Sequence, residues 1–244
     1  MDTQTSPPLA LLIPAAGLGR RMGSRKTLLE LAGRPLLFHT LDRFQPFRRR
    51  ICCTILIVHP DDLAAITSTW GETLRNTYGV TDILPGGSRR QDSVRAGLAR
   101  VPAEAALVAI HDAVRPFVAP EAVAAALDAA AAIGAAIVAS PMKPTVKRCS
   151  EGRIAATIRR DDLWCAQTPQ VFRRQLILDA YAAAERDGLD VTDDAQLVEH
   201  LGQPVAIVPG SDLNLKITTP EDLALALALL AAGLAPGKDW KEPS

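Results

Sequence analysis

Short apolar runs alternate with longer amphipathic stretches along most of the chain. The apolar runs are unbroken, as in parallel strands that are buried on both faces of a sheet. The stretches between them repeat apolar residues at helical spacing, which predicts helices. Predicted strands cover residues 9–13, 51–58, 82–84, 106–110, 135–139, 205–208 and 213–217. Predicted helices cover about 35–44, 61–78, 89–101, 120–133, 173–187 and 193–201, and a last helix begins at Thr219-Pro220-Glu221, with Thr218 or Thr219 as its cap. The alternation predicts an α/β fold with a doubly wound, mostly parallel sheet.

The alternation is interrupted between residues 141 and 160. Two β-rich pieces, 145–149 and 154–158, surround Ser150-Glu151-Gly152 and predict a hairpin. Apart from Glu151 this segment has no acidic residue, and it carries several Lys and Arg. We interpret it as a β-arm that projects from a single domain spanning residues 1–244.

The first apolar run, at residues 9–13, stops at Pro14 and leads into a loop of small residues. That loop continues as Ala15-Ala16-Gly17-Leu18-Gly19, and cations follow at Arg20, Arg21, Arg25 and Lys26. Small residues after a strand let backbone N–H groups approach an anion, and cations neutralise a polyphosphate. A dinucleotide fingerprint fails at Met22, and a Walker loop fails because Ser24 follows Gly23. On this stretch alone, a nucleotidyltransferase loop and an ordinary strand–turn–helix with solvated arginines both stay open.

Further polar groups follow other predicted strands. They are Gly86-Gly87-Ser88, His111-Asp112, and Asn214 with Lys216. In an open α/β sheet, ligands bind outside the carboxyl ends of the strands, so these groups are expected at one edge. Asp112 is the best candidate ligand for Mg²⁺, which takes few carboxylates and obtains its other ligands from phosphates and water. His111 is expected to orient this loop.

The chemistry that such a site suggests needs no general base. A phosphate monoester has a second pKa of about 6 and is already largely dianionic at neutral pH. The protein then has to hold two polyanions together and neutralise charge at the reacting phosphorus, which Arg, Lys and Mg²⁺ can do.

Composition excludes several other classes of protein. Of 244 residues, 48% are hydrophobic, and 27 Lys and Arg balance 27 Asp and Glu, so a basic nucleic-acid binder is not expected. Aromatic residues make up 4%, too few for a platform that stacks single strands. The four cysteines form no C-x-x-C pair, which argues against a zinc site or a disulfide framework. With no secretory signal pattern and no apolar stretch long enough to span a bilayer, we expect a cytoplasmic protein without membrane contact.

Several motifs resemble those of one known family. They are Pro14-Ala15-Ala16-Gly17-x-Gly19-x-Arg21-Met22, Gly86-Gly87-Ser88-x-Arg90-x-x-Ser93-Val94, His111-Asp112-Ala113-x-Arg115-Pro116, Pro141-x-x-x-Thr145-x-Lys147, Leu163-Trp164-x-x-Gln167-Thr168-Pro169-Gln170, Thr192-Asp193-Asp194 and Lys216-Ile217-Thr218. Together they resemble the 2-C-methyl-D-erythritol 4-phosphate cytidylyltransferases of the non-mevalonate isoprenoid pathway.

The resemblance implies a Rossmann-like nucleotidyltransferase that uses CTP, a polyol phosphate and Mg²⁺, and releases pyrophosphate. By motif, the nucleotide would be bound by Pro14, Ala15, Ala16, Gly17, Gly19, Gly87, Ser88 and Ser93. The catalytic residues would be Arg21, Lys26, Asp112 and Lys216, with Asp112 also meeting the metal. The sugar phosphate would contact Asp112, Arg115, Thr145, Arg160, Thr168 and Lys216. The family is similar in being homodimeric with an exchanged arm, so Thr145 and Arg160 would serve the partner's site.

The chain departs from the family pattern at some positions. Arg25-Lys26-Thr27 stands where Pro-Lys-Gln is usual, the loop from Met22 is shorter, and Leu213-Asn214-Leu215 replaces Asp-Asn-Ile. Two alternatives therefore stay open: a cytidylyltransferase for another polyol phosphate, such as ribitol 5-phosphate, and a non-catalytic nucleotide-binding protein on the same fold. A sugar transferase is disfavoured, because no Asp-x-Asp pair is found where one would bind its metal.

Overall fold

The structure is a computed structural model that describes residues 6–17 and 29–234. Three predicted site residues, Gly19, Arg21 and Lys26, lie outside the described residues.

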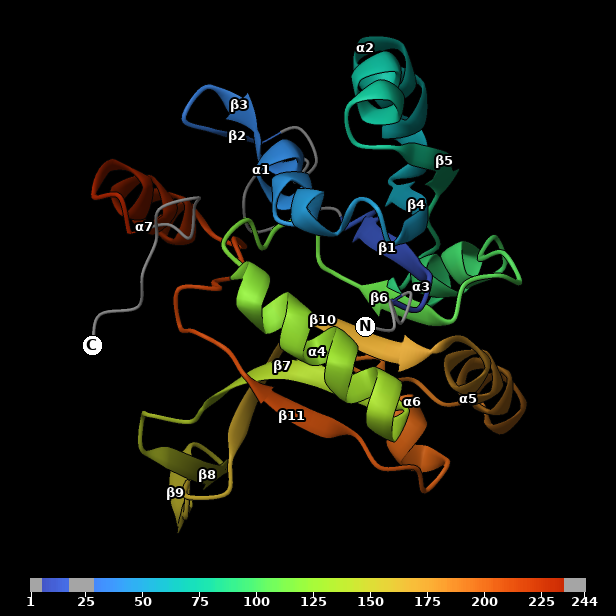
Figure 1. Cartoon of the computed structure of the whole chain (residues 1–244). Helices are drawn as coiled ribbons and strands as arrows, with labels where there is room; N and C mark the ends of the chain where they lie inside the picture. The colour runs from blue at the N-terminus through green and yellow to red at the C-terminus, as the bar shows by residue number, and fades with distance from the viewer. Residues whose placement is uncertain (1–5, 18–28, 235–244) are drawn as a thin grey trace, which may run out of the picture.

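Within the described residues, one sheet of seven strands forms the centre of the molecule (Figure 1). Its order is β11-β7-β10-β6-β1-β4-β5. The strands are β1 Leu9–Ala15, β4 Ile51–Val58, β5 Val80–Pro85, β6 Leu107–Ile110, β7 Ala135–Pro141, β10 Trp164–Arg173 and β11 Ala206–Pro209. Neighbours pair in parallel except where β10 pairs with β6 and β7. The predicted doubly wound, mostly parallel sheet is confirmed.

Helices cover both faces of this sheet. Helices α1 Leu36–Asp42, α2 Leu63–Asn76 and α4 Pro120–Ile133 pack into the apolar layer on one face, and α3 Arg90–Leu98, α5 Arg174–Asp187 and α6 Ala195–His200 pack into the layer on the other. Alternate residues of β1 enter the two layers: Leu11 belongs to the first and Leu12 to the second. Burial on both faces explains why this strand is apolar throughout.

The last helix, α7 Pro220–Ala231, lies apart from these layers, beside the small ribbon of β2 Glu30–Leu31 and β3 Arg34–Pro35 (Figure 1). Thr219 is its N-cap and forms a capping box with Asp222, which confirms one of the two caps considered from sequence. Short 3₁₀ turns at Gln45–Phe47 and Pro60–Asp62 complete the regular structure. In the part of the chain that the structure describes, no helix is both long and apolar enough to cross a membrane.

Several strands begin or end one or two residues from the predicted position, and one predicted strand is absent. Strand β1 does not stop at Pro14 but continues to Ala15, beyond the last residue that pairs with β6. Residues 213–217 form no strand, although their apolar residues alternate. Leu213, Leu215 and Ile217 instead pack against the apolar cluster that includes α7. Alternation here reflects packing of an irregular segment on a helix.

Strand β10 is absent from the sequence-based prediction. Its middle carries Gln167, Thr168, Pro169 and Gln170, with a cis bond before the proline, and its pairing with β7 shifts register there. A polar run with a proline is typical of a loop rather than a central strand. The three polar residues are nevertheless buried, because other segments supply their hydrogen-bond partners.

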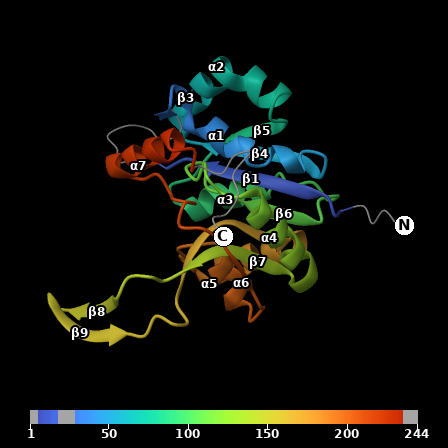
Figure 2. The ribbon, with the colours of Figure 1, turned by 60° about the vertical axis from the view of Figure 1, so that its left-hand side comes forward.

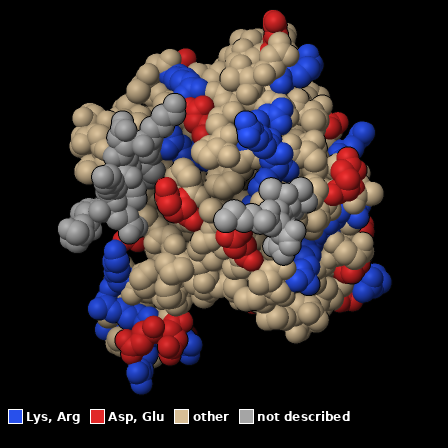
Figure 3. Space-filling view, viewed as in Figure 1, with Lys and Arg blue, Asp and Glu red and all other residues tan. Residues whose placement is uncertain are grey.

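The predicted arm is present as β8 Val146–Ser150 paired antiparallel with β9 Arg153–Ile158. Glu151 and Gly152 make the turn with positive φ angles of 49° and 73°. The arm enters from β7 and returns into β10, and it extends away from the sheet (Figure 2). Basic and acidic side chains lie together on it (Figure 3), and Arg159 is 2.9 Å from Asp161.

Candidate active site

A pocket of about 310 Å³ lies at the carboxyl ends of the parallel strands. Its lining residues come from the end of β1, the loops that follow β1, β4, β5 and β6, the start of α3 and the segment before α7: Pro14, Ala15, Ala16, Gly17, His59, Gly87, Ser88, Arg89, Arg90, Ser93, Asp112, Ala113, Val114 and Lys216. Most of the described residues predicted to bind nucleotide or to act in catalysis therefore share one hollow. This is the edge at which open α/β sheets bind ligands.

The loops after β1 and β5 touch each other at Gly86. A Cβ atom on Gly86 would lie 2.3 Å from Cβ of Ala16 and 2.7 Å from Oγ of Ser93, closer than atoms can approach. The Gly86 N–H donates to the carbonyl of Val58 at 2.8 Å, which ties this loop to the end of β4. Only glycine allows this contact, and it places the two backbone loops on one side of the pocket.

The hydroxyl of Ser93, a residue predicted to bind nucleotide, forms hydrogen bonds to the backbone of two neighbouring residues. It accepts from the Gly87 N–H at 3.1 Å and donates to the Arg89 carbonyl at 3.2 Å. Ser93 lines the pocket and braces the glycine loop from the first turns of α3.

Asp112 lies at the centre of the charged groups. Within the described chain, its carboxylate forms ion pairs with Arg90 (Nε to Oδ1, 3.3 Å), Lys216 (Nζ to Oδ2, 2.9 Å) and Arg115 (Nε to Oδ2, 3.6 Å). Burial by itself would raise the pKa of Asp112, but the charges of Arg90 and Lys216 outweigh it and hold that pKa far below its usual range. The carboxylate is therefore ionised throughout the physiological range.

His111 and Thr168 hold the backbone of Asp112 in place. The Asp112 N–H donates to Oγ1 of Thr168 at 3.0 Å, and Oγ1 lies 3.1 Å from Nδ1 of His111. Nε2 of His111 lies 3.0 Å from the carbonyl of Arg115. A neutral imidazole with its proton on Nε2 satisfies all these bonds, since Thr168 then donates to Nδ1. Burial lowers the pKa of His111 to about 4, so the neutral ring persists at neutral pH. The expectation that His111 orients this loop agrees with the geometry.

Asn214 positions the segment that carries Lys216. Its amide nitrogen donates to Oε1 of Gln167 at 2.9 Å and to the Thr168 carbonyl at 3.0 Å. The backbone carbonyl of Asn214 accepts from Nη1 of Arg115 at 2.7 Å. Arg115 and Thr168 thus hold the segments of Asp112 and Asn214 in place, and neither of them lines the pocket. Lys216, with 40% of its side chain exposed, reaches the pocket itself.

The two arm residues are not brought to this pocket. Thr145 and Arg160 are exposed; Thr145 directly precedes β8 and Arg160 follows the end of β9. Other residues were given no role by sequence reasoning but belong to the site: His59 and Arg89 line the pocket, and Arg90 pairs with Asp112. Arg90 stood within a quoted motif, directly after a glycine loop and at a helix start, which was a usable signal.

The residues present fit a weakly held divalent ion. In the described residues, no group of three or more His, Cys, Asp or Glu side chains could enclose a metal. Among the described residues that line the pocket, Asp112 is the one carboxylate, and cations surround it. A single carboxylate suits Mg²⁺ when phosphate oxygens supply further ligands. Lys216 would then have to move from Oδ2 of Asp112 to a phosphate, so that the carboxylate oxygen can face the ion.

We predict that Gly86→Ala weakens nucleoside triphosphate binding, because a methyl group there forces the loops after β1 and β5 apart. The dissociation constant for CTP, measured by titration calorimetry, should rise about tenfold or more. Gly71→Ala is the matched control, since its Cβ would meet only Thr67 at 3.7 Å within α2. Unchanged CTP affinity in Gly86→Ala would contradict the role given to this contact.

Comparisons with known proteins agree with this geometry. The family model described as 2-C-methyl-D-erythritol 4-phosphate cytidylyltransferase matches residues 9–232. The protein of that name from Syntrophus aciditrophicus is 45% identical over 230 residues, covering 92% of this chain and 96% of its own. The one from Bacillus licheniformis is 42% identical over 229 residues, covering 91% and 95%.

Solved structures give the same result. The enzyme of that name from Thermus thermophilus superposes with a TM-score of 0.75 at 36% identity, covering 92% of this chain and 99% of its own. The 4-diphosphocytidyl-2C-methyl-D-erythritol synthase from Anaerococcus prevotii gives a TM-score of 0.79 at 32% identity, covering 93% and 99%. This chain belongs to the 2-C-methyl-D-erythritol 4-phosphate cytidylyltransferase family.

Proposed function

We propose that this protein transfers CMP from CTP to 2-C-methyl-D-erythritol 4-phosphate and releases pyrophosphate, a step in isoprenoid precursor synthesis by the non-mevalonate route. The observation that carries the proposal is the shared pocket, where two small-residue loops face Asp112 and Lys216. Membership of the family supports the same substrates. The presence of Asp112 and Lys216 favours an enzyme over a non-catalytic binder.

In the proposed reaction, a phosphate oxygen of the polyol phosphate attacks the α-phosphorus of CTP. A new P–O bond joins the two phosphates as the bond to the β-phosphate breaks, and pyrophosphate leaves. The attacking oxygen carries no proton that must be removed at neutral pH. The hydrogen bonds of His111 engage both of its nitrogens, which is consistent with a reaction that uses no histidine base.

The chain's own contribution is charge and position. Residues 15–17 and 87–88 border the space proposed for the triphosphate, and Lys216 can turn from Asp112 toward a phosphate. Arg90 and Arg115 stay with the carboxylate when Lys216 leaves it. Mg²⁺, held by Asp112 together with phosphate oxygens, would neutralise charge on the α- and β-phosphates. Arg21 and Lys26 are proposed to add positive charge from the loop outside the described residues.

We also propose a homodimer in which the arm of one protomer completes the site of its partner. The arm extends away from the sheet (Figure 2). Thr145 and Arg160 are exposed in the single chain, and neither of them lines the pocket. An exposed arginine on a projecting arm is suited to bind a phosphate in the site of another subunit. The cytoplasmic location stays a prediction from sequence.

The first prediction concerns the substrate. Pyrophosphate release from CTP should occur with 2-C-methyl-D-erythritol 4-phosphate in the presence of Mg²⁺, measured by a coupled pyrophosphatase assay. Ribitol 5-phosphate should give little turnover at the same concentration. Turnover with ribitol 5-phosphate alone would reject the proposed substrate, and no turnover with either would reject the proposed reaction.

The second prediction concerns Asp112. Asp112→Asn removes the negative charge that we assign to the metal, so Mg²⁺-dependent turnover should fall about 100-fold. Asp187→Asn, which removes an exposed carboxylate paired with His200 far from the pocket, serves as control. Circular dichroism should show that both variants keep the fold. Retained turnover in folded Asp112→Asn would count against its role.

The third prediction concerns the arm. Asp112→Asn and Arg160→Ala should each be nearly inactive alone, because each lacks one group at every site. If arms cross between protomers, co-expressed mixed dimers contain one site with Asp112 and Arg160 both intact, and activity partly returns. Mixed dimers without any recovered activity would show that each arm serves its own subunit.

A further inference from the structure

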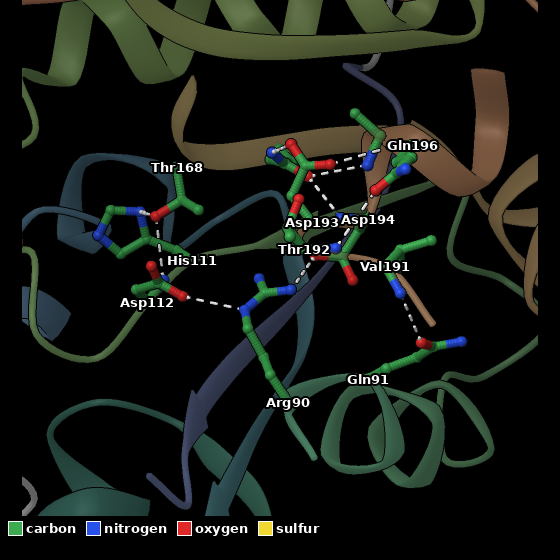
Figure 4. Close-up of polar contacts among 12 residues, drawn as sticks. Arg90, Gln91, His111, Asp112, Thr168, Val191, Thr192, Asp193, Asp194 and Gln196 are labelled. Atoms are coloured by element: carbon green, nitrogen blue, oxygen red, sulfur yellow. Dashed lines mark hydrogen bonds and ion pairs between the residues drawn. The ribbon is translucent and has the colours of Figure 1, made fainter. Parts of the chain in front are cut away.

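The loop between α5 and α6 is attached to the first turn of α3 by the side chains of Gln91 and Arg90. Gln91 donates to the Leu189 carbonyl at 3.2 Å and accepts from the Val191 N–H at 3.4 Å. Beside it, Nη1 of Arg90 lies 2.8 Å from Oδ2 of Asp194. Figure 4 shows Arg90 extending from α3 between Asp112 on one side and the 192–194 loop on the other.

Asp194 is buried and tightly fixed, with 1% of its side chain exposed. Its Oδ1 accepts from the hydroxyl of Tyr181 at 2.6 Å. Its backbone N–H and that of Ala195 both donate to Oε1 of Gln170, at 3.0 Å each. The second carboxylate oxygen is left for Arg90, which in the described chain is the one cation paired with it. A buried carboxylate is strongly destabilised when it is unpaired, so Asp194 should hold Arg90 in this position.

Arg90 therefore joins two carboxylates with different surroundings. Asp112 borders the pocket, whereas Asp194 does not line it. Burial by itself would lower the pKa of Arg90, but the charges of Asp194 and Asp112 outweigh this and raise it, so the guanidinium stays charged. Its planar fork contacts one carboxylate through Nε and the other through Nη1, whereas a lysine would have to meet both with a single nitrogen on a flexible stem.

We propose that Asp194 is a positioning residue of the active site: it anchors Arg90, and the anchored Arg90 fixes Oδ1 of Asp112 so that Oδ2 stays on the side of Lys216. Asp194 touches no substrate in this arrangement and acts only through Arg90. The inference rests on the proposed cytidylyl transfer for its activity readout.

Arg90 and Lys216 therefore differ in how firmly they are held beside Asp112. Arg90 is a permanent partner, because Asp194 holds its far end. Lys216, half exposed and in the pocket, is the partner free to move to a phosphate. Without Asp194, Arg90 keeps a single carboxylate, Asp112, and is free to rotate about it. The carboxylate then loses its fixed orientation, although every group in the pocket is still present.

The decisive test is a cycle of Asp194→Asn and Arg90→Gln. Asp194→Asn keeps the size of the side chain and an oxygen for Tyr181 but removes the charge that holds Arg90. Its kcat should fall about tenfold, as when a group that orients a ligating side chain is removed. The KM for CTP should change less than about twofold, since Asp194 does not line the pocket.

Introducing Asp194→Asn into the Arg90→Gln variant shows whether Asp194 acts through Arg90 or by stabilising the loop in general. If Asp194 acts only through Arg90, adding Asp194→Asn to Arg90→Gln should change kcat less than about twofold. Full additivity of the two changes would overturn the proposal. Asp193→Asn is the matched control, because it removes a carboxylate from the same loop that bonds Gln170 and Gln196 but not Arg90. Asp193→Asn should retain the wild-type kcat; a tenfold fall would show that loosening the loop is sufficient.

A measurement independent of activity is the Nε–H signal of Arg90 in a ¹⁵N-arginine spectrum, identified by its absence in Arg90→Gln. In the wild type, this proton lies against Asp112 and should exchange slowly with water. Exchange should become about tenfold faster in Asp194→Asn and stay slow in Asp193→Asn. Unchanged exchange in Asp194→Asn would overturn the anchoring, whether or not the protein transfers CMP.

Arg90→Lys provides a second variant if Asp194→Asn does not fold. It keeps the charge but would have to meet both carboxylates with a single nitrogen on a flexible stem, so kcat should fall by a factor similar to that of Asp194→Asn. Wild-type kcat in Arg90→Lys would reject the bridge. An inactive wild-type protein with the expected exchange pattern would instead reject the proposed reaction and leave the anchoring in place.

Discussion

The site depends on one buried carboxylate that cations from three segments surround. Arg90 comes from the start of α3, Arg115 from the loop after β6, and Lys216 from the segment before α7. A carboxylate with 8% of its side chain exposed is costly unless it is paired, and each cation is likewise stabilised by it. The interaction therefore requires these distant segments to converge at one edge of the sheet. It also provides both signs of charge where two polyanions and a divalent ion are proposed to meet.

Strand β10 supports this arrangement from within the sheet. Thr168 bonds the backbone of Asp112, Gln167 bonds Asn214 in the segment of Lys216, and Gln170 bonds the start of α6. One polar strand thus fixes three loops that carry or support charged side chains. Because it runs antiparallel between β6 and β7, it can enter from the arm and bring these side chains past the carboxyl ends of the parallel strands.

The arm and β10 belong to one excursion of the chain. After β7 the backbone leaves the sheet, forms the hairpin of β8 and β9, and returns as β10. The insertion that extends the molecule outward therefore also supplies the strand that supports the pocket. This continuity gives a structural link between the proposed dimer arm and the proposed active site, although they are far apart within a single chain (Figure 2).

The sequence by itself determined the alternation of strands and helices, the arm, and the convergence of the loops at residues 14–17 and 86–88 with Asp112. These features follow from periodicity and from the rule that parallel strands end at a common edge, which are local or topological properties. The tertiary structure alone decided that the polar segment of Gln167, Thr168 and Gln170 is a central strand and that residues 213–217 are not one. It also decided that Arg90 joins Asp112 to Asp194, a contact across 104 residues of chain between Arg90 and Asp194. Such contacts depend on which polar partners meet in space, and neither residue spacing nor propensity carries that information.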